Sequence, residues 1–179
     1  MKNIFIAGVA RSGKSTLSKI LRQKENYNYI PLDYFASSLK HNFPETKITS
    51  NVIIDKESSK KLSLLLSRVI EIINCSKEKF IIDSAHIMPQ DIINYLDREL
   101  WDIYYLGYPN ICAEEKLISI RKYDDEGDWT FNKKDEELIK ILDKLISISK
   151  EIQEECESLN ITFIDTGKNI KEEIEKVLE

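Results

Sequence analysis

The chain has 179 residues and a formal net charge of −5 at pH 7. This length suits a single domain with a substantial core, and 42% hydrophobic and 32% charged residues are ordinary for a globular protein. The negative balance argues against a general nucleic-acid-binding role, which needs a basic surface. We therefore expect one domain over residues 1–179 that has no nucleic-acid partner.

The chain shows no sign of membrane insertion or export. No apolar stretch reaches the roughly 20 residues that a membrane-crossing helix needs, and the N-terminus leads directly into an apolar run rather than a targeting segment. Its three cysteines, Cys75, Cys112 and Cys156, are isolated and form no C-x-x-C pair. These features predict a cytoplasmic protein with reduced thiols and no membrane partner, either a monomer or a homodimer.

Strand-like and helix-like segments alternate along the chain. In chain order, strands are predicted at 3–7, 27–32, 79–83, 101–107 and 161–165. Helices are predicted at 16–22, 58–75, 89–98, 110–122, 134–159 and 169–178, with a short helix or turn at 33–40. This alternation predicts an α/β fold in which a mainly parallel sheet is covered on both faces. Ligands in such sheets bind beyond the carboxyl ends of the strands.

Two of these helices carry further expectations. The helix at 110–122 is expected to take Asn110 as its N-cap. The helix at 134–159 has an apolar stripe, which is either buried on the sheet or forms a dimer seam; burial on the sheet is the favoured interpretation.

The run Gly8–Ser15 matches G-x-x-x-x-G-K-[ST], the phosphate-binding loop. Its two glycines let the backbone curl so that successive N–H groups bind phosphate oxygens, and the following helix adds the positive end of its dipole. Lys14 would reach the β- and γ-phosphates, and the Ser15 hydroxyl would ligate Mg²⁺. Arg11 would either meet a substrate phosphate or remain solvated. The expected nucleotide contacts are Gly8, Ala10, Arg11, Ser12, Gly13, Lys14, Ser15 and Thr16.

Two aspartates follow predicted strands at the same edge of the sheet. Asp83 ends the apolar run Phe80–Ile82 and is predicted to hold Mg²⁺ opposite Ser15. Asp33 follows the second strand and is interpreted either as the base for an attacking hydroxyl or as a helix N-cap. His86 would either touch an acceptor or lie at the surface.

Arg121 lies at the end of the helix predicted at 110–122, just before the polar segment 124–132. A cation there would stabilise the charge of a group in transfer, or it would complement the helix dipole. The segment after it is expected to close over the site and exclude water. We therefore expect a lid over about residues 110–133.

The order of these segments resembles the adenylate-kinase-like family of small P-loop kinases, which includes nucleoside monophosphate, shikimate and gluconate kinases. The resemblance implies a three-layer α/β/α fold with five parallel strands in the order 2-3-1-4-5. It also implies an ATP-dependent phosphotransferase with Mg²⁺ as cofactor. On this model Lys14, Asp33 and Arg121 are catalytic, and Ser15 and Asp83 hold the metal.

The chain departs from this family where an acceptor phosphate would bind. No arginine lies between Arg22 and Arg68, whereas nucleoside monophosphate kinases need several. The departure favours a neutral or hydroxyl-bearing acceptor over a monophosphate. The acceptor itself, a nucleotide, a nucleoside or another hydroxyl compound, remains open.

The sequence also contains features of two other functions. Residues 124–127 fit D-x-x-G and residues 132–135 fit N-K-x-D, which are GTPase signatures, but the two lie together in one polar loop without the strand that should precede N-K-x-D. We interpret both matches as coincidence. The second alternative is a regulatory NTPase that binds nucleotide without a small-molecule acceptor.

Overall fold

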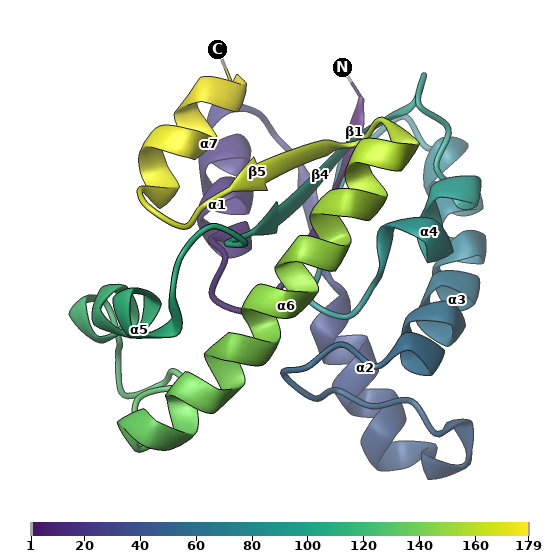
Figure 1. Ribbon diagram of the computed structural model, residues 1–179. Coiled ribbons are helices and arrows are strands. Elements are labelled where there is room, and N and C mark those ends of the chain that lie inside the picture. Colours follow the sequence, from purple (N-terminus) through teal and green to yellow (C-terminus); the bar gives the residue numbers. More distant parts are fainter. Residues whose placement is uncertain (1, 179) are drawn as a thin grey trace.

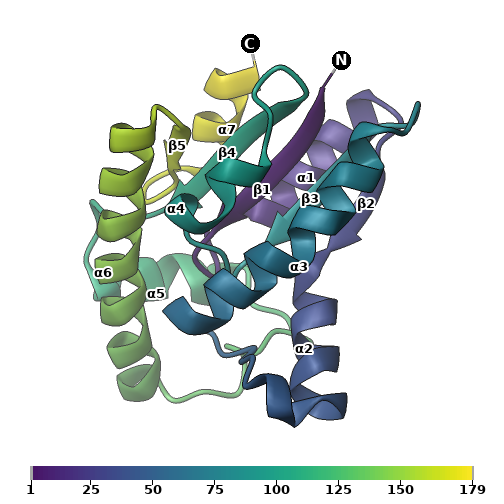
Figure 2. The same cartoon turned by 90° about the vertical axis from the view of Figure 1, so that its right-hand side faces the viewer.

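The computed structural model describes residues 2–178, so residues 1 and 179 of the expected domain lie outside the described part. Five parallel strands form one sheet (Figure 1). The strand order is β2-β3-β1-β4-β5 (Figure 2). This confirms the predicted α/β class and the strand order. The strands are β1 (Asn3–Gly8), β2 (Asn28–Pro31), β3 (Phe80–Ser84), β4 (Trp101–Gly107) and β5 (Thr162–Asp165).

The helices connect successive strands and cover both faces of the sheet. They are α1 (Lys14–Lys24), α2 (Leu32–Asn42), α3 (Lys56–Asn74), α4 (Pro89–Ile92), α5 (Ala113–Lys122), α6 (Asp135–Leu159) and α7 (Ile170–Leu178). Leu17 and Leu21 of α1 and Ile174 of α7 are buried in a hydrophobic cluster with β1 residues. A larger cluster on the opposite face joins β1 and β4 to α3, α4 and α6 (Figure 2). Burying each such side chain contributes about 1.5–3 kcal/mol.

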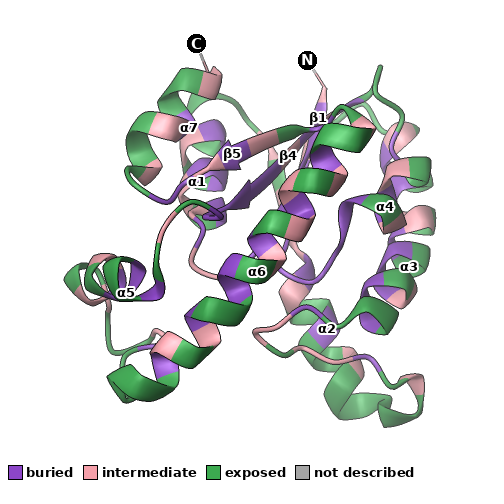
Figure 3. Ribbon diagram, viewed as in Figure 1, coloured by how far each residue is buried: buried purple, intermediate pink, exposed green. Residues whose placement is uncertain are grey.

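The apolar stripe of α6 lies inside the protein. Leu138, Leu142, Leu145 and Ile152 are fully buried, and the helix packs against α5, β4, α4 and β5. Figure 3 shows the buried side of α6 turned toward the sheet and its exposed side turned outward. The stripe is therefore covered by the chain's own sheet and helices, as the favoured interpretation expected.

The strand register brings the carboxyl ends of the strands to one edge. Pro31 of β2 and Ile6 of β1 both pair with Asp83 of β3. On the other side, Gly8 pairs with Leu106, and the next residue of β4, Gly107, pairs with Asp165. The loop after β1 and the side chain of Asp83 thus meet at the edge where ligands are expected.

Two local predictions were wrong, and one of the two alternatives for Asp33 is excluded. The helix predicted at 89–98 stops at Ile92 and continues only as a short 3₁₀ turn to Tyr95. The chain then turns, because the Asp97 carbonyl accepts from the N–H groups of Leu100 and Trp101 before β4 begins.

The other error and the excluded alternative concern helix starts. Helix α5 begins at Ala113 with Cys112 as N-cap, whereas Asn110 donates to Asp165 Oδ2 (2.8 Å). Helix α2 begins at Leu32, so Asp33 lies inside its first turn and is not the N-cap.

Within residues 2–178, no helix is long and apolar enough to cross a bilayer.

Candidate active site

The loop between β1 and α1 has the backbone geometry of a phosphate cradle. Gly8 has a φ of 133°, and a Cβ there would lie 1.9 Å from the Leu106 carbonyl oxygen. Gly13 has a φ of 94°, and a Cβ there would lie 2.5 Å from Ile170. L-residues are strained at such φ values. Both glycines of the motif are therefore required by conformation and by close packing.

The end of this loop presents hydrogen-bond donors that have no partner among residues 2–178. The first bond of the helix ladder runs from Leu17 N–H to the Gly13 carbonyl (3.0 Å), so the N–H groups of Lys14, Ser15 and Thr16 have no partner within the helix. The Ser12 hydroxyl is fully buried and has no hydrogen-bond partner among the described residues. A buried orphaned hydroxyl beside a helix N-terminus fits a bound phosphate.

Lys14 is buried at the base of this loop. Its Nζ donates to the Val9 carbonyl at 2.7 Å. Burial lowers the pKa of Lys14, and the negative charges of Asp83 and Asp33 partly oppose that shift. The Lys14 ammonium lines the cavity, where donor phosphates would add further negative charge.

Asp83 is held by two hydroxyl groups that the sequence did not indicate. Its Oδ2 accepts from Tyr29 Oη at 2.9 Å and from Ser18 Oγ at 3.2 Å. Burial raises the pKa of Asp83, and the Lys14 charge opposes that shift. Burial and the neighbouring Asp83 also raise the pKa of Tyr29, which keeps its phenol protonated as a donor.

The donor set fits a magnesium ion that is completed by phosphate oxygens. Mg²⁺ prefers oxygen ligands and is commonly held by one or two carboxylates together with substrate phosphates. Ser15 and Asp83 both line the cavity that contains Lys14. No cluster of three or more metal-binding side chains occurs within residues 2–178, so the protein would supply only part of the coordination.

The cavity over the loop has a volume of about 760 Å³, within the roughly 300–1,000 Å³ of typical small-molecule sites. Loop residues, Asp83 and the first turns of α2 and α7 line it. Its walls carry more basic than acidic side chains. The basic ones are Arg11, Lys14, Lys116, Lys168 and Lys171, and the acidic ones are Asp33, Asp83 and Asp128.

Lys116 of α5 is a cavity residue that the sequence analysis missed. It is 1% exposed, and its Nζ lies 4.1 Å from the ring centroid of Tyr108, whose own hydroxyl donates to the Ala10 carbonyl (2.8 Å). Burial, with a further contribution from Arg11, lowers the pKa of Lys116 to about 8. Nothing in the motif marks this lysine, because only the packing of α5 against the loop brings it there.

Asp33 lies at the rim of the same cavity. Its Oδ1 accepts from the Ala85 N–H at 3.0 Å and lies 3.6 Å from His86 Nε2. His86 is buried rather than at the surface, and burial lowers its pKa. The carboxylate is thus positioned through one oxygen, while its side chain is 46% exposed.

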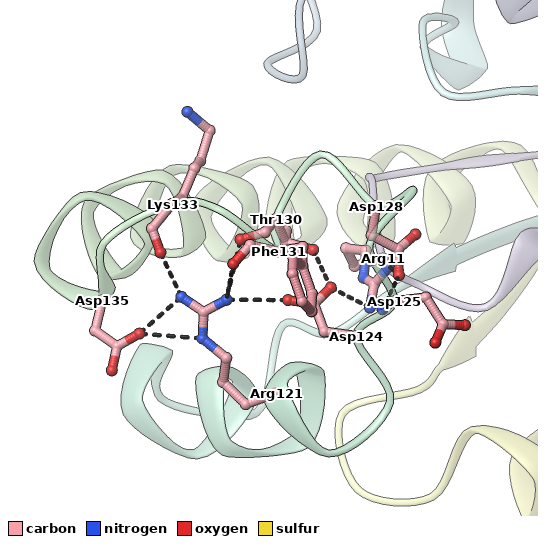
Figure 4. A network of polar contacts seen from close by, with 9 residues as sticks. All are labelled: Arg11, Arg121, Asp124, Asp125, Asp128, Thr130, Phe131, Lys133 and Asp135. Carbon is pink, nitrogen blue, oxygen red and sulfur yellow. Dashed lines mark hydrogen bonds and ion pairs between the residues drawn. The ribbon is translucent and has the colours of Figure 1, made fainter.

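Arg121 is not among the residues that line this cavity. Its guanidinium donates to the carboxylates of Asp124 (3.0 Å) and Asp135 (2.8 and 3.1 Å) (Figure 4). It also donates to the backbone carbonyls of Thr130, Phe131 and Lys133. These bonds engage all the guanidinium nitrogens within residues 121–135, the segment expected to form the lid together with the start of α6, so the structure does not bring Arg121 together with Lys14 and Asp33.

Arg11 links the phosphate loop to the lid. It has a φ of 62°, and its guanidinium contacts Asp124 at 3.3 Å and Asp128 at 2.8 Å (Figure 4). Asp124 therefore bridges Arg11 and Arg121. These ion pairs replace the solvated alternative for Arg11. Arg11 also lines the cavity, and its contact with a substrate phosphate stays a prediction.

The GTPase-like fragments belong to this lid. Asp124 and Asp135, the aspartates that begin D-x-x-G and end N-K-x-D, pair with arginines, and no strand lies between α5 and α6. The fragments therefore have structural partners that explain both aspartates.

Comparison with solved structures gives the same fold class. The chain is similar to a shikimate kinase from Bacteroides thetaiotaomicron, with a TM-score of 0.62 and 15% identity over 98% of this chain and 96% of that one. A sugar kinase from Janibacter sp. HTCC2649 gives a TM-score of 0.59 and 16% identity over 99% of this chain and 92% of that one. A gluconokinase from Sinorhizobium meliloti 1021 gives a TM-score of 0.55 and 13% identity over 99% of this chain and 89% of that one.

No protein-family model matches the chain, and no curated protein matches it either. At these identities the likeness is one of fold. The chain has the fold of the small P-loop kinases of the adenylate-kinase-like type, as the resemblance implied.

Proposed function

We propose that this protein is an ATP-dependent kinase that transfers the γ-phosphoryl group of ATP to a hydroxyl group of a small molecule. The observation that carries the proposal is a single cavity that joins the unengaged donors of the loop, the ammonium of Lys14 and the carboxylates of Asp83 and Asp33. The structural neighbours named as shikimate, sugar and gluconate kinases support it.

On the donor side, the loop would bind and orient the triphosphate. The N–H groups at the start of α1 and the Ser12 hydroxyl would donate to phosphate oxygens, and Lys14 would balance charge on the β- and γ-phosphates. Lys116 is better placed than Arg121 to add a second positive charge, because it lines the cavity. Ser15 and Asp83 would hold Mg²⁺, which when bound neutralises charge on the donor phosphates.

On the acceptor side, Asp33 would act as the base. The acceptor oxygen forms a new bond to the γ-phosphorus, the bond to the oxygen bridging the β-phosphate breaks, and the acceptor's hydroxyl proton passes to Asp33. The bond from Ala85 N–H to Oδ1 fixes the carboxylate. Positioning and charge neutralisation would supply most of the acceleration.

A binding experiment and a turnover experiment test this function together. Calorimetry should detect MgATP binding to the wild type, and a coupled assay should detect ADP release that depends on one compound of an acceptor panel. Lys14→Ala should reduce kcat/KM by about 10²–10³, the loss typical of removing one preorganised electrostatic contact. Lys19→Ala, on the exposed side of the same helix, is the matched control.

Each possible negative result has a different meaning for the proposed function. No heat with MgATP would contradict the proposal at its base. MgATP binding without acceptor-stimulated ADP release would instead favour the regulatory NTPase. Parallel titration with MgGTP tests the choice of ATP as donor.

A further inference from the structure

A second, smaller cavity adjoins the first and has a different chemistry. Its volume is about 250 Å³, below the roughly 300–1,000 Å³ of sites for drug-sized ligands. It shares Ala10, Asp33, Ala85 and Trp129 with the larger cavity. It adds Val52 and polar side chains from α2 and the loop before α3, together with His86. Asp33 therefore stands where the two cavities meet, at the position that phosphoryl transfer between them requires.

The charge of the small cavity is negative. Asp33 is its ionised side chain, and neither lysine nor arginine is among the described residues that line it. Burial lowers the pKa of His86, the neighbouring Asp33 opposes that shift and Lys14 adds to it, so the uncharged form of His86 is favoured. Lys40 is exposed and donates to Asn51 Oδ1 at 3.3 Å, but it does not line the cavity.

The neutral groups of the cavity suit hydroxyl ligands. Ser37, Ser50 and Asn51 offer side chains that both donate and accept hydrogen bonds. Trp129 contributes an aromatic wall from the lid. Proteins that select carboxylate or phosphate groups usually use arginine, whose planar donors match such anions, and an anion here would instead face the Asp33 carboxylate.

We infer that the small cavity is the acceptor subsite and that its substrate class is a small hydroxyl compound without a carboxylate or phosphate group. This inference rests on the proposed kinase function and narrows its acceptor. Asp33 would accept a bond from the hydroxyl to be phosphorylated, and the serine and asparagine side chains would bind the other hydroxyls. The large cavity selects for phosphate, and the small one selects against it.

Matched pairs of compounds that differ in one anionic group test this inference. The probes are D-glucose with D-gluconate, glycerol with D-glycerate, and adenosine with AMP. The fluorescence of Trp129 reports binding in the small cavity when it is read with MgADP in the large one, because Trp129 lines both cavities and the other tryptophan, Trp101, lies buried at the start of β4. Trp129→Phe should abolish the signal. Coupled ADP release with wild type and Lys14→Ala measures turnover for the same compounds.

We expect an uncharged member of at least one pair to change Trp129 fluorescence and to stimulate Lys14-dependent ADP release at least tenfold more than its anionic counterpart. A preference for the anionic members, or no response to any uncharged member, overturns the inference. The proposed kinase function survives the first of these results, because turnover of an anion would still depend on Lys14.

A charge placed in the cavity gives a second test. Ser37→Arg adds a cation to the lining, on an exposed position of α2. It should raise kcat/KM for an anionic substrate, divided by kcat/KM for its neutral counterpart, at least tenfold. Ser38→Arg, on the next residue of the same helix and outside the lining, should leave that ratio unchanged. An equal effect of the two variants would contradict the assignment of the subsite.

Discussion

The phosphate loop and the lid both carry conspicuous polar side chains, but the two regions use them in opposite ways. In the loop, the buried Ser12 hydroxyl has no partner among the described residues, and the first N–H groups of α1 point beyond the helix ladder. In the lid, Arg121 donates to two carboxylates and three backbone carbonyls. The polar groups of the loop remain available to a ligand, whereas those of the lid bind one another.

This difference explains why a cation near a sequence motif is not necessarily part of the site. Arg121 and Lys116 lie five residues apart on α5, yet only Lys116 lines the large cavity. A guanidinium that already has six hydrogen bonds would lose them on moving to a phosphate. A buried ammonium beside an aromatic ring has no such bonds to lose. The contrast between engaged and unengaged groups can be tested at individual residues.

After Lys14→Ala, the largest effect is expected at Asp33, which has one oxygen on the Ala85 N–H and lies at the junction of the cavities. Asp33→Asn should lower kcat by about 10²-fold, at the lower end of the range for general-base catalysis, because the amide keeps the Ala85 contact but accepts no proton. MgATP affinity should remain. Steady-state kinetics and calorimetry check this, with the exposed Asp143→Asn of α6 as control. An unchanged kcat would show that Asp33 is not the base.

Lys116 should give MgATP affinity a pH dependence. Because its pKa is about 8, raising the pH from 7 to 9 deprotonates it and should weaken MgATP binding by about tenfold, the lower limit for a charged hydrogen bond. Lys116→Met should bind weakly at both pH values. Calorimetry at pH 7 and pH 9 decides this, and the same pH response in the variant would contradict it.

The contribution of Lys116 to the stability of the nucleotide-free protein should show the opposite trend. At this lysine the unfolded chain, with a pKa near 10.5, binds more protons than the folded chain between about pH 8 and 10.5, so Lys116 contributes a rise in the free energy of unfolding over this range. Lys116→Met should lack the part of the rise that comes from Lys116. Urea unfolding of both proteins at pH 8 and pH 10 measures the difference.

Two buried serines of the same region separate binding from stability. Ser12→Ala removes a hydroxyl without a partner, so stability should not fall, while MgATP affinity should drop by up to about tenfold. Ser18→Ala removes the bonds to Asp83 and to the Lys14 carbonyl and should lower stability by about 1 kcal/mol. Urea unfolding and calorimetry measure both quantities. A loss of stability in Ser12→Ala would mean that this hydroxyl serves the fold.

The smallest effect on catalysis is expected at Arg121. Arg121→Met should open the lid locally and speed proteolytic cleavage within residues 123–134 by about tenfold, with less loss of kcat/KM than Lys14→Ala. Arg68→Met, an exposed arginine paired with Glu71 on α3, controls for loss of a surface ion pair. If Arg121→Met matched Lys14→Ala in kcat/KM while the lid remained protected, Arg121 would have the catalytic role that the sequence suggested.

One error and one excluded alternative of the sequence analysis share one cause. Asn110, expected as a helix cap, instead donates to Asp165, 55 residues away, and Asp33 accepts from Ala85, 52 residues away. Capping rules consider only neighbours along the chain. They do not account for a competing partner supplied by another strand end, and at this edge of the sheet several strand ends meet.

The sequence by itself determined the phosphate loop and the alternation of strands and helices. Both depend on residues close together in the chain: glycines that permit a positive φ, and apolar residues repeated at the period of a helix or strand. Only the tertiary structure decided which side chains surround the loop. Tyr29 and Ser18 reach Asp83 across 54 and 65 residues, and Arg121 binds within the lid while Lys116 enters the cavity. The physical reason is that such contacts depend on the register of the sheet and on how α5 packs, and local sequence patterns do not encode either.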